Sequence, residues 1–444
     1  MKRLLIAIVV VALMGIVCPV SATSRSRERN RNEVLSRGQG FYKDVFMDGG
    51  IGLTSRYFLP ATRFLGLTID YYASPATPKL SQKDTLFQAS IFCGSEEDTN
   101  GWLLYPDGAP RYRAIYVNGG SAGKHAVSLT EQGRKRIQEF VAAGGSYVGT
   151  CAGAYFATAG SKRNGKGVIN RKIYLHLWPG IMHSTHLNKS QTPLRIERKS
   201  PLLRYYDFGG DYVVDSVRHN GGGYALGEEA GALPEKTEVL ARYVFKNNSK
   251  VQIDNKPAIW AYKGGENSGR AVLIGSHPEA IKRGERLELM SAALLYAMDG
   301  NAKPQVKGVL TPNQLREMCL KTEDNKPEYT RIGDRQYHHF EITVPKHCQR
   351  LVISLNGYKG EDNFDLILCA KSKELAFAHN APWKVETKGC NKELVIEKPK
   401  AGKWFISVYC ATAVGSFVDE FGTTYTGRTD VLNGVPYSVK ATLF

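Results

Sequence analysis

GGSYVGTCAGAYFATAG, residues 144–160, is the stretch of this 444-residue chain that decides its fold. Tyr147 and Val148 predict a strand, the small residues around Cys151 predict a sharp turn, and residues 154–159 favour a helix. A strand, a tight turn and a helix in this order form a nucleophile elbow, in which the turn holds a side chain in a strained conformation. The positive end of the helix favours the thiolate form of the cysteine, and the amide of Ala152 points toward a developing oxyanion.

Cys151 could also be a small buried residue in a helix start, because free cysteines are among the most buried residue types. Its partners favour the reactive interpretation. VLIGSHPEAI, residues 272–281, ends a hydrophobic run with His277-Pro278-Glu279. In an extended segment residues i and i+2 face the same way, so Glu279 can orient the imidazole of His277 while that ring reaches Cys151. We therefore predict a catalytic triad of Cys151, His277 and Glu279.

Between residues 41 and 298, short strand-like runs alternate with helical ones. This alternation predicts an α/β domain with a flavodoxin-like, mainly parallel sheet that carries helices on both faces. The expected strands are 42–47, 67–72, 114–117, 146–149 and 271–274, and the expected helices include 130–143 and 286–298. Ligand chemistry should lie at the carboxyl ends of the strands.

The pattern changes after this domain. Residues 299–325 collect Pro, Gly, Lys and Asn, which predicts a linker. Runs such as HHFEITV and KWFISVYC then alternate with turn residues, which predicts an antiparallel β-sandwich over 326–444. Five of the eight cysteines lie beyond residue 318, which suggests a C-terminal domain stapled by disulfides whose pairing the sequence leaves open.

The amino terminus has the features of an export signal. Lys2 and Arg3, an apolar run over 4–17 and small residues at 20–22 predict cleavage after about residue 22, hence a signal peptide over 1–22. The apolar run is shorter than the roughly 20 residues that span a membrane, so we expect no membrane span and a periplasmic or extracellular bacterial protein. A lipoprotein anchor at Cys18 is the disfavoured alternative. The basic stretch from Arg25 to Arg31 predicts a disordered tether over 23–40.

The formal net charge of +17 raises nucleic acid or an anionic surface as a partner. The other lysines and arginines are scattered, and no basic motif with interleaved aromatics accompanies them, so we favour a solvated basic surface and no nucleic-acid binding. His176, His183 and His186 are spaced as metal ligands sometimes are, but no carboxylate or cysteine set completes a site. We expect neither a metal nor a cofactor.

The residues around the elbow resemble the class I glutamine amidotransferase-like superfamily and, within it, the biotin-protein ligase N-terminal-like domain. The resemblance covers residues 42–298 and rests on Gly149-x-Cys151-x-Gly153, His277-Pro278-Glu279, and the phrases IYVNGG and GTCAGAYFA. It implies that Gly119 or Gly120 supplies a second oxyanion amide beside that of Ala152. Glutamine-hydrolysing members usually carry Gln where this chain has Tyr155, so free glutamine is not the expected substrate.

The C-terminal region also resembles a known family. GDRQYHHFEI, FDLILCA and KPKAGKWFISVY are similar to the bacterial pre-peptidase C-terminal domain, a small β-sandwich appended to secreted hydrolases. The resemblance implies an exported enzyme, with envelope or glycan contact through this domain. The glycines of HNGGG, residues 219–223, predict a loop that rims the site, or else a tight turn. Tyr155, Asn220, Gly221 and Gly222 are therefore candidates for substrate binding.

Two functions fit these observations. The first is an exported cysteine hydrolase that cleaves the C–N bond of a peptide or small amide: the thiolate attacks the carbonyl, backbone amides hold the oxyanion, and His277 protonates the leaving amine. The alternative is a non-catalytic binding module of the same fold at the cell envelope, which the replacement of Gln by Tyr155 motivates.

Overall fold

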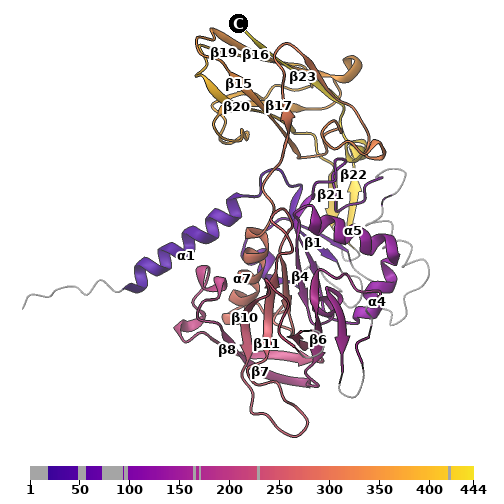
Figure 1. Ribbon diagram of the computed structural model, residues 1–444, viewed down its shortest axis with the longest axis vertical. Coiled ribbons are helices and arrows are strands. Elements are labelled where there is room, and N and C mark those ends of the chain that lie inside the picture. The colour runs from indigo at the N-terminus through magenta and orange to yellow at the C-terminus, as the bar shows by residue number, and fades with distance from the viewer. Residues whose placement is uncertain are drawn as a thin grey trace, which may run out of the picture.

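The computed structural model describes residues 19–48, 57–72, 94, 99–163, 167–169, 172–227, 231–418 and 422–444, without the side chains of 19–23. An α/β domain lies below a β-rich domain in Figure 1. The predicted export signal falls almost wholly on residues 1–18, outside this part, as does Cys93. Among the described residues, none of the helices combines the length and the apolar character that crossing a membrane requires.

The α/β domain is built on a nine-stranded sheet. Its parallel half has the order β2-β1-β3-β4-β12, with bounds Ile69–Tyr72, Lys43–Asp48, Tyr112–Val117, Ser146–Thr150 and Ala271–Ile274. The sheet continues with the antiparallel strands β11, β10, β7 and β8, which span Pro257–Tyr262, Glu238–Tyr243, Asn188–Ile196 and Val213–Asn220. The predicted strands are present within two residues at each end.

The prediction of a mainly parallel sheet is wrong, because the sheet is mixed. Parallel neighbours need a crossover of a dozen residues or more, usually with a helix, whereas antiparallel neighbours join through short connections. The eight residues 263–270 between β11 and β12 are too few for such a crossover, and residues 244–256 between β10 and β11 contain no helix. The connection between β7 and β8 holds two 3-10 turns and no α-helix, so this half of the sheet folds as hairpins.

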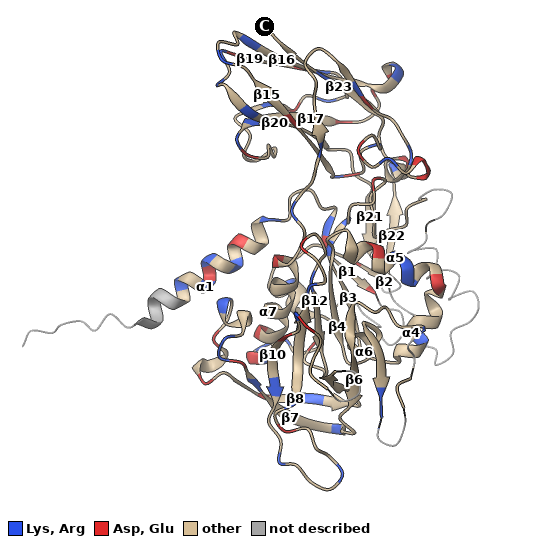
Figure 2. Cartoon of the chain, viewed as in Figure 1, with Lys and Arg blue, Asp and Glu red and all other residues tan. Residues whose placement is uncertain are grey.

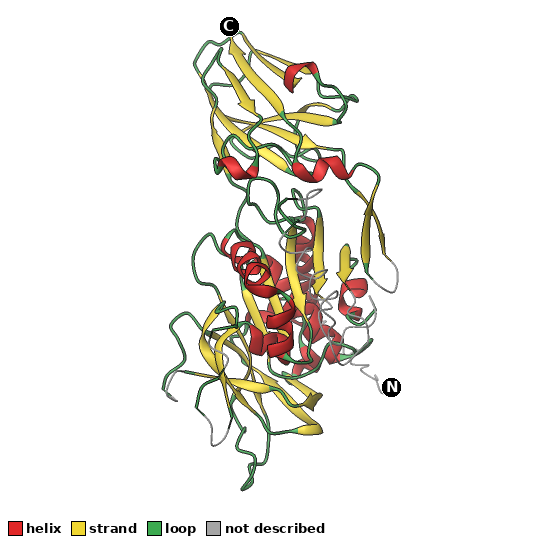
Figure 3. Cartoon of the chain, turned by 90° about the vertical axis from the view of Figure 1, so that its right-hand side faces the viewer, coloured by secondary structure: helices red, strands yellow, loops and turns green. Residues whose placement is uncertain are grey.

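Helices cover both faces of the sheet (Figures 1 and 3). One face carries α4, α5 and α6, spanning Ala122–Ser128, Thr130–Ala142 and Ala152–Phe156; the other carries α2 and α7, spanning Pro60–Phe64 and Glu285–Asp299. The neighbouring residues Ile115 and Tyr116 of β3 belong to different buried clusters, as the alternation of side chains along a strand requires. A small sheet of β5 (Thr158–Lys162), β6 (Trp178–Ser184) and β9 (Gly223–Leu226) completes the domain.

The basic segment after the predicted signal is a helix, α1, over Pro19–Ser36. The prediction of a disordered tether over 23–40 is therefore wrong. Arg27 forms an ion pair with Asp207 at 2.8 Å, and Arg31 donates to the carbonyl of Tyr205 at 2.6 Å while its guanidinium lies over the ring of Tyr206. These charged side chains fix the helix against the α/β domain, so its low hydrophobicity does not leave it disordered.

The C-terminal region is a β-rich domain of two sheets, and its predicted antiparallel pairing holds except at the edge, where β13 pairs parallel with β15. One sheet has the order β13-β15-β20-β17-β18, spanning Val306–Val309, Tyr337–Val344, Gly402–Cys410, Leu366–Ser372 and Trp383–Val385. The other has the order β14-β23-β16-β19, spanning Leu315–Met318, Tyr437–Leu443, Arg350–Gly357 and Lys392–Glu397. Strands β13 and β14 fall inside 299–325, so this segment supplies an edge strand to each sheet instead of serving only as a linker.

The five cysteines of the C-terminal region, Cys319, Cys348, Cys369, Cys390 and Cys410, are all free. The predicted disulfide staple is therefore wrong for the cysteines that the structure describes. Four of them are buried among apolar side chains, where a cysteine acts as a small hydrophobic residue. The thiol of Cys390, for example, donates to the carbonyl of Phe364 at 3.2 Å, and burial raises the pKa of Cys369 to about 12.

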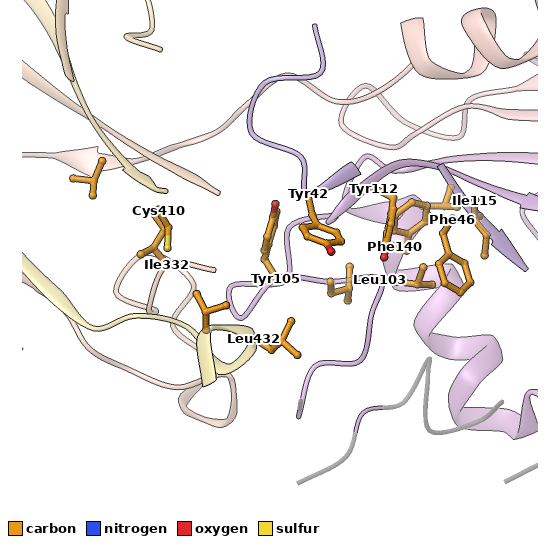
Figure 4. Packing of buried hydrophobic residues seen from close by; sticks show 14 of the residues in the cluster. Tyr42, Phe46, Leu103, Tyr105, Tyr112, Ile115, Phe140, Ile332, Cys410 and Leu432 are labelled. Carbon is orange, nitrogen blue, oxygen red and sulfur yellow. The ribbon is translucent and has the colours of Figure 1, made fainter. Parts of the chain in front are cut away.

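A hairpin from the C-terminal domain reaches the α/β domain (Figure 3). Its strands β21 (Gly415–Val418) and β22 (Thr423–Thr426) lie next to edge strand β2, where the amide of Tyr71 donates to Thr423 Oγ1 at 2.9 Å. The ring of Tyr425 lies 4.3 Å from that of Trp102. Figure 4 shows the continuation of this contact: Tyr42, Leu103, Tyr105 and Tyr112 of the α/β domain approach Ile332 and Leu432 of the sandwich. One buried cluster thus spans both domains.

A buried ion pair crosses the same boundary. Arg111 Nη2 donates to Asp334 Oδ2 at 3.1 Å, and the two side chains are 3% and 1% exposed. The guanidinium also lies over the rings of Tyr42 and Tyr425, at 4.5 and 5.4 Å from their centroids. Neither charge reaches water in the folded protein. Separation of the domains would therefore leave both groups without their partner until water solvates them.

We predict that Arg111→Met lowers the free energy of unfolding by about 3–5 kcal/mol, because it leaves the Asp334 carboxylate buried without its cation. Urea unfolding followed by tryptophan fluorescence measures this loss. Lys371→Ala, which removes an exposed ion pair with Glu374, is the matched control and should cost less than about 1 kcal/mol. Equal small losses in both variants would contradict a structural role for the interdomain pair.

Candidate active site

Cys151 lies at the corner between β4 and α6. Its backbone has φ 46° and ψ −104°, a conformation that non-glycine residues rarely adopt, and its amide donates to the carbonyl of Ile274 at 2.9 Å. A Cβ on Gly153 would lie 2.1 Å from the carbonyl oxygen of Val117, and one on Gly149 would lie 2.6 Å from the backbone of Gly153. The glycines on both sides of Cys151 are therefore required by close backbone approach, and the corner has the geometry of a nucleophile elbow.

His277 and Glu279 lie just beyond the end of β12, which pairs with β4. The Nδ1 atom of His277 lies 2.8 Å from Oε1 of Glu279, whose side chain is only 3% exposed. The ring also approaches Cys151: a Cβ on Gly119 would lie 2.4 Å from Cε1 of His277 and 3.5 Å from Cβ of Cys151. The structure thus brings all three residues of the predicted triad to one place.

The surroundings of His277 act on its charge in opposite directions. Burial lowers the pKa of the ring, but hydrogen bonding to Cys151 and Glu279, together with the negative charges of those two groups, raises it to about 10. Because Glu279 occupies Nδ1, Nε2 is the nitrogen left for the thiol. These surroundings therefore favour the imidazolium form of His277, which lies between the side chain of Cys151 and the buried side chain of Glu279.

The candidate oxyanion amides surround the same thiol. Gly119 and Gly120 follow β3, with φ 138° at Gly120, and the side-chain amide of Asn118 donates to the carbonyl of Gly119 at 2.7 Å. Ala152 opens α6, where the first amides of a helix have no intrahelical acceptor. Gly119 follows β3 and lies beside Cys151, and Ala152 follows Cys151 at the end of the neighbouring strand β4.

The residues predicted to bind substrate lie in different parts of the domain. The hydroxyl of Tyr155 donates to the carbonyl of Gly222 at 2.9 Å, which joins the nucleophile helix to the HNGGG loop. Gly221 and Gly222 both have φ 87°. Asn220 is exposed and lies opposite Asn188 in the pairing of β7 with β8. The loop is therefore joined through Gly222 to the helix that follows Cys151.

The histidines with metal-like spacing lie in and around β6. The rings of His183 and His186 are 6.0 Å apart, and His183 stacks on Tyr224 with 5.1 Å between ring centroids. Burial lowers the pKa of His183. Within the described ranges, no group of three or more His, Cys, Asp or Glu side chains is arranged to hold a metal ion.

Sequence reasoning missed two residues beside the triad. His219 is fully buried on β8, and burial together with the charge of His277 lowers its pKa to about 4, so the ring is neutral. Its Nε2 lies 2.8 Å from Thr192 Oγ1. Tyr243 of β10 donates its hydroxyl to the carbonyl of Gly223 at 2.8 Å. His219 belongs to the motif HNGGG, which the sequence singled out, but no local sequence pattern marks Tyr243.

A match to one family model agrees with the sequence resemblance of the α/β domain. Residues 109–325 match the family model described as "Biotin-protein ligase, N terminal". No curated protein matches the chain. Solved structures with similarity include a glutamine amidotransferase (16% identity, 57% of this chain and 98% of that chain, TM-score 0.33) and a putative ThuA-like protein from Bacteroides uniformis (12%, 59% and 95%, 0.33). Another is the pre-peptidase C-terminal domain of a collagenase from Bacillus anthracis (10%, 32% and 100%, 0.18).

We predict that Glu279→Gln lowers the pKa of His277, which ring signals in an NMR titration will report, with exposed His347 as internal reference. The folded-state pKa of about 10 exceeds the ordinary value of 6.5, so the ion pair stabilises the fold fully below about pH 6.5 and loses this effect as pH rises through 10. The variant should therefore lose about 1.5–3 kcal/mol of unfolding free energy at pH 6 and much less above pH 10. An equal loss at both pH values would show that no charged pair exists.

Proposed function

We propose that this domain of the biotin-protein ligase N-terminal family, at residues 109–325, is a cysteine hydrolase that cleaves the C–N bond of a peptide or small amide. The observation that carries the proposal is the meeting of a thiol in a left-handed elbow conformation with an imidazole whose far nitrogen is held by a buried carboxylate. A base oriented by a third group beside a nucleophile is the recurring arrangement of covalent catalysis.

The proposed reaction has two steps. The Cys151 sulfur bonds to the carbonyl carbon, and the amides of Gly119 or Gly120 and of Ala152 stabilise the oxyanion; the C–N bond then breaks as His277 gives a proton to the leaving amine. Water, deprotonated by His277, next attacks the thioester and releases the acid and the thiolate. Glu279 keeps the ring in its orientation throughout, as the hydrogen bond at 2.8 Å supports.

Free glutamine is not the proposed substrate. Tyr155 stands where glutamine-hydrolysing proteins usually carry Gln, and its hydroxyl is engaged by Gly222. We also propose that the reaction takes place outside the cytoplasm, on the strength of the apolar N-terminal sequence and the resemblance of the C-terminal domain to those of secreted hydrolases. On this proposal the β-sandwich supplies contact with the envelope or with glycan.

A binding module of the same fold is the second candidate. It is favoured by the low exposure of Cys151, which is 5%, because a buried thiol is less accessible to a substrate. A polyanion partner has less support. Figure 2 shows lysine and arginine distributed over α1, α5, β7, β8 and the sandwich, without concentration on one element.

We predict that iodoacetamide alkylates Cys151 of the folded protein, and that His277→Ala slows this reaction about 100-fold, because a positioned acid–base group contributes about 10²–10⁴ to rate. Mass spectrometry of tryptic peptides measures the rate at each cysteine. Half-buried Cys319, far from His277 in the sandwich, is the internal control and should react equally in both proteins. Hydrolysis across peptides and amides, with Cys151→Ala as blank, then identifies the substrate. Slow alkylation that equals the rate in denatured protein, with no turnover, would favour the binding module.

A further inference from the structure

A short backbone segment connects the two halves of the candidate site. Residues 218–223, here named the glycine strap, comprise the end of β8, two glycines in the left-handed region and the first residue of β9. The strap lies between helix α6, which follows Cys151, and residues 275–277, which end in the imidazole.

On the histidine side, two backbone hydrogen bonds hold the strap. The amide of His277 donates to the carbonyl of Arg218 at 2.9 Å, and the amide of Gly223 donates to the carbonyl of Gly275 at 2.9 Å. The two bonds lie on either side of Ser276, so they fix both the position and the direction of the chain that carries the ring.

On the cysteine side, the side chain of Tyr155 contacts the strap at the carbonyl of Gly222, which also accepts from the amide of Thr185 at 3.0 Å. Tyr155 lies one helical turn after the nucleophile, and its amide donates to the carbonyl of Cys151 at 3.0 Å. Its hydroxyl donates to the carbonyl of Gly222 at 2.9 Å. Tyr155 therefore links α6 to the strap, and through the strap to the histidine segment.

The glycines leave no room for adjustment. A Cβ on Gly222 would lie 2.2 Å from the carbonyl oxygen of Gly275, and a Cβ on Gly275 would lie 1.8 Å from that of Gly223. A Cβ on Gly223 would lie 2.7 Å from the hydroxyl of Tyr155. Real Cβ atoms do not approach other atoms so closely, so only glycine fits at these positions. The backbones of the strap and of residues 275–277 are therefore in direct contact, and a displacement of the strap also displaces residue 277.

We propose that Tyr155 is a positioning residue, whose hydroxyl holds the glycine strap so that His277 stays at a reactive distance from Cys151. The effect of Tyr155 on catalysis rests on the proposed function, whereas its effect on the position of His277 does not. Burial, aided by the charge of Cys151, raises the pKa of Tyr155, so the hydroxyl keeps its proton and acts as a donor. A role in substrate binding alone predicts a different outcome, because it leaves the imidazole in place when the hydroxyl is removed.

The test removes only the hydroxyl. Because a misplacement of about 1 Å can cost about 100-fold in rate, Tyr155→Phe should slow alkylation of Cys151 by about 10- to 100-fold and lower kcat with little change in KM. Tyr71→Phe is the control for loss of a tyrosine hydroxyl: that ring is fully buried on β2, whereas Tyr155 is partly buried, and the Tyr71 hydroxyl has no partner among the described residues. It should react as the wild type does. Gly222→Ala, which forces the strap away from Gly275, should produce a larger loss than Tyr155→Phe.

A second readout separates this inference from the proposed function. The ring of His277 faces Cys151, Glu279 and His219, so its NMR titration reports its position even without turnover. A shifted titration in Tyr155→Phe, with the melting temperature unchanged, supports the positioning role whether or not the wild type hydrolyses amides. An unchanged titration and alkylation rate overturn it, as does a rise in KM alone. Failure of the proposed function would give a different result: the alkylation rate of Cys151 would then be the same in the wild type and in His277→Ala.

Discussion

The parallel pairing of β4 with β12 is the constraint on which the candidate site depends. Thr150 lies opposite Ile274 in this register, and the next amide, that of Cys151, donates to the carbonyl of Ile274. Carboxyl ends of parallel strands share one edge of a sheet, so residues far apart in the sequence must meet there. Strand β3, the other neighbour of β4, delivers Gly119 to the same edge. The register between β4 and β12 therefore accounts for both the strand arrangement and the position of the site.

Two of the buried ion pairs in the described part of the chain compensate a carboxylate in the same manner. Glu279 is almost wholly buried and is compensated by His277, and Asp334 is buried and compensated by Arg111. In each case water is excluded, so the interaction is stronger than it would be at the surface, and the loss of one partner leaves the other uncompensated. The first pair sits beside the thiol, whereas the second joins the domains. The β-sandwich is thus a fixed part of the molecule, packed on the α/β domain through one core.

Strong local patterns allowed prediction of the elbow, of His277 and Glu279, and of the strands of the parallel half within about two residues. Features set by distant contacts could not be predicted. Helix α1 has no apolar stripe, and it is held by ion pairs such as Arg27 with Asp207. The antiparallel half depends on the absence of crossover helices, and the hydrogen bond from Tyr155 to Gly222 depends on tertiary packing. The cysteine count suggested disulfides, but the five C-terminal cysteines are free, and four of them are buried.

Trapping of the acyl-enzyme is the direct test of whether Cys151 and His277 act as nucleophile and base: the protein is mixed with an activated ester, quenched in acid within seconds, and digested for mass spectrometry. We expect an acyl group on the peptide that contains residue 151, at full occupancy before steady-state turnover, and its absence in His277→Ala. Acylation spread over surface lysines, with residue 151 unmodified in the folded wild type, would show that Cys151 is not the nucleophile.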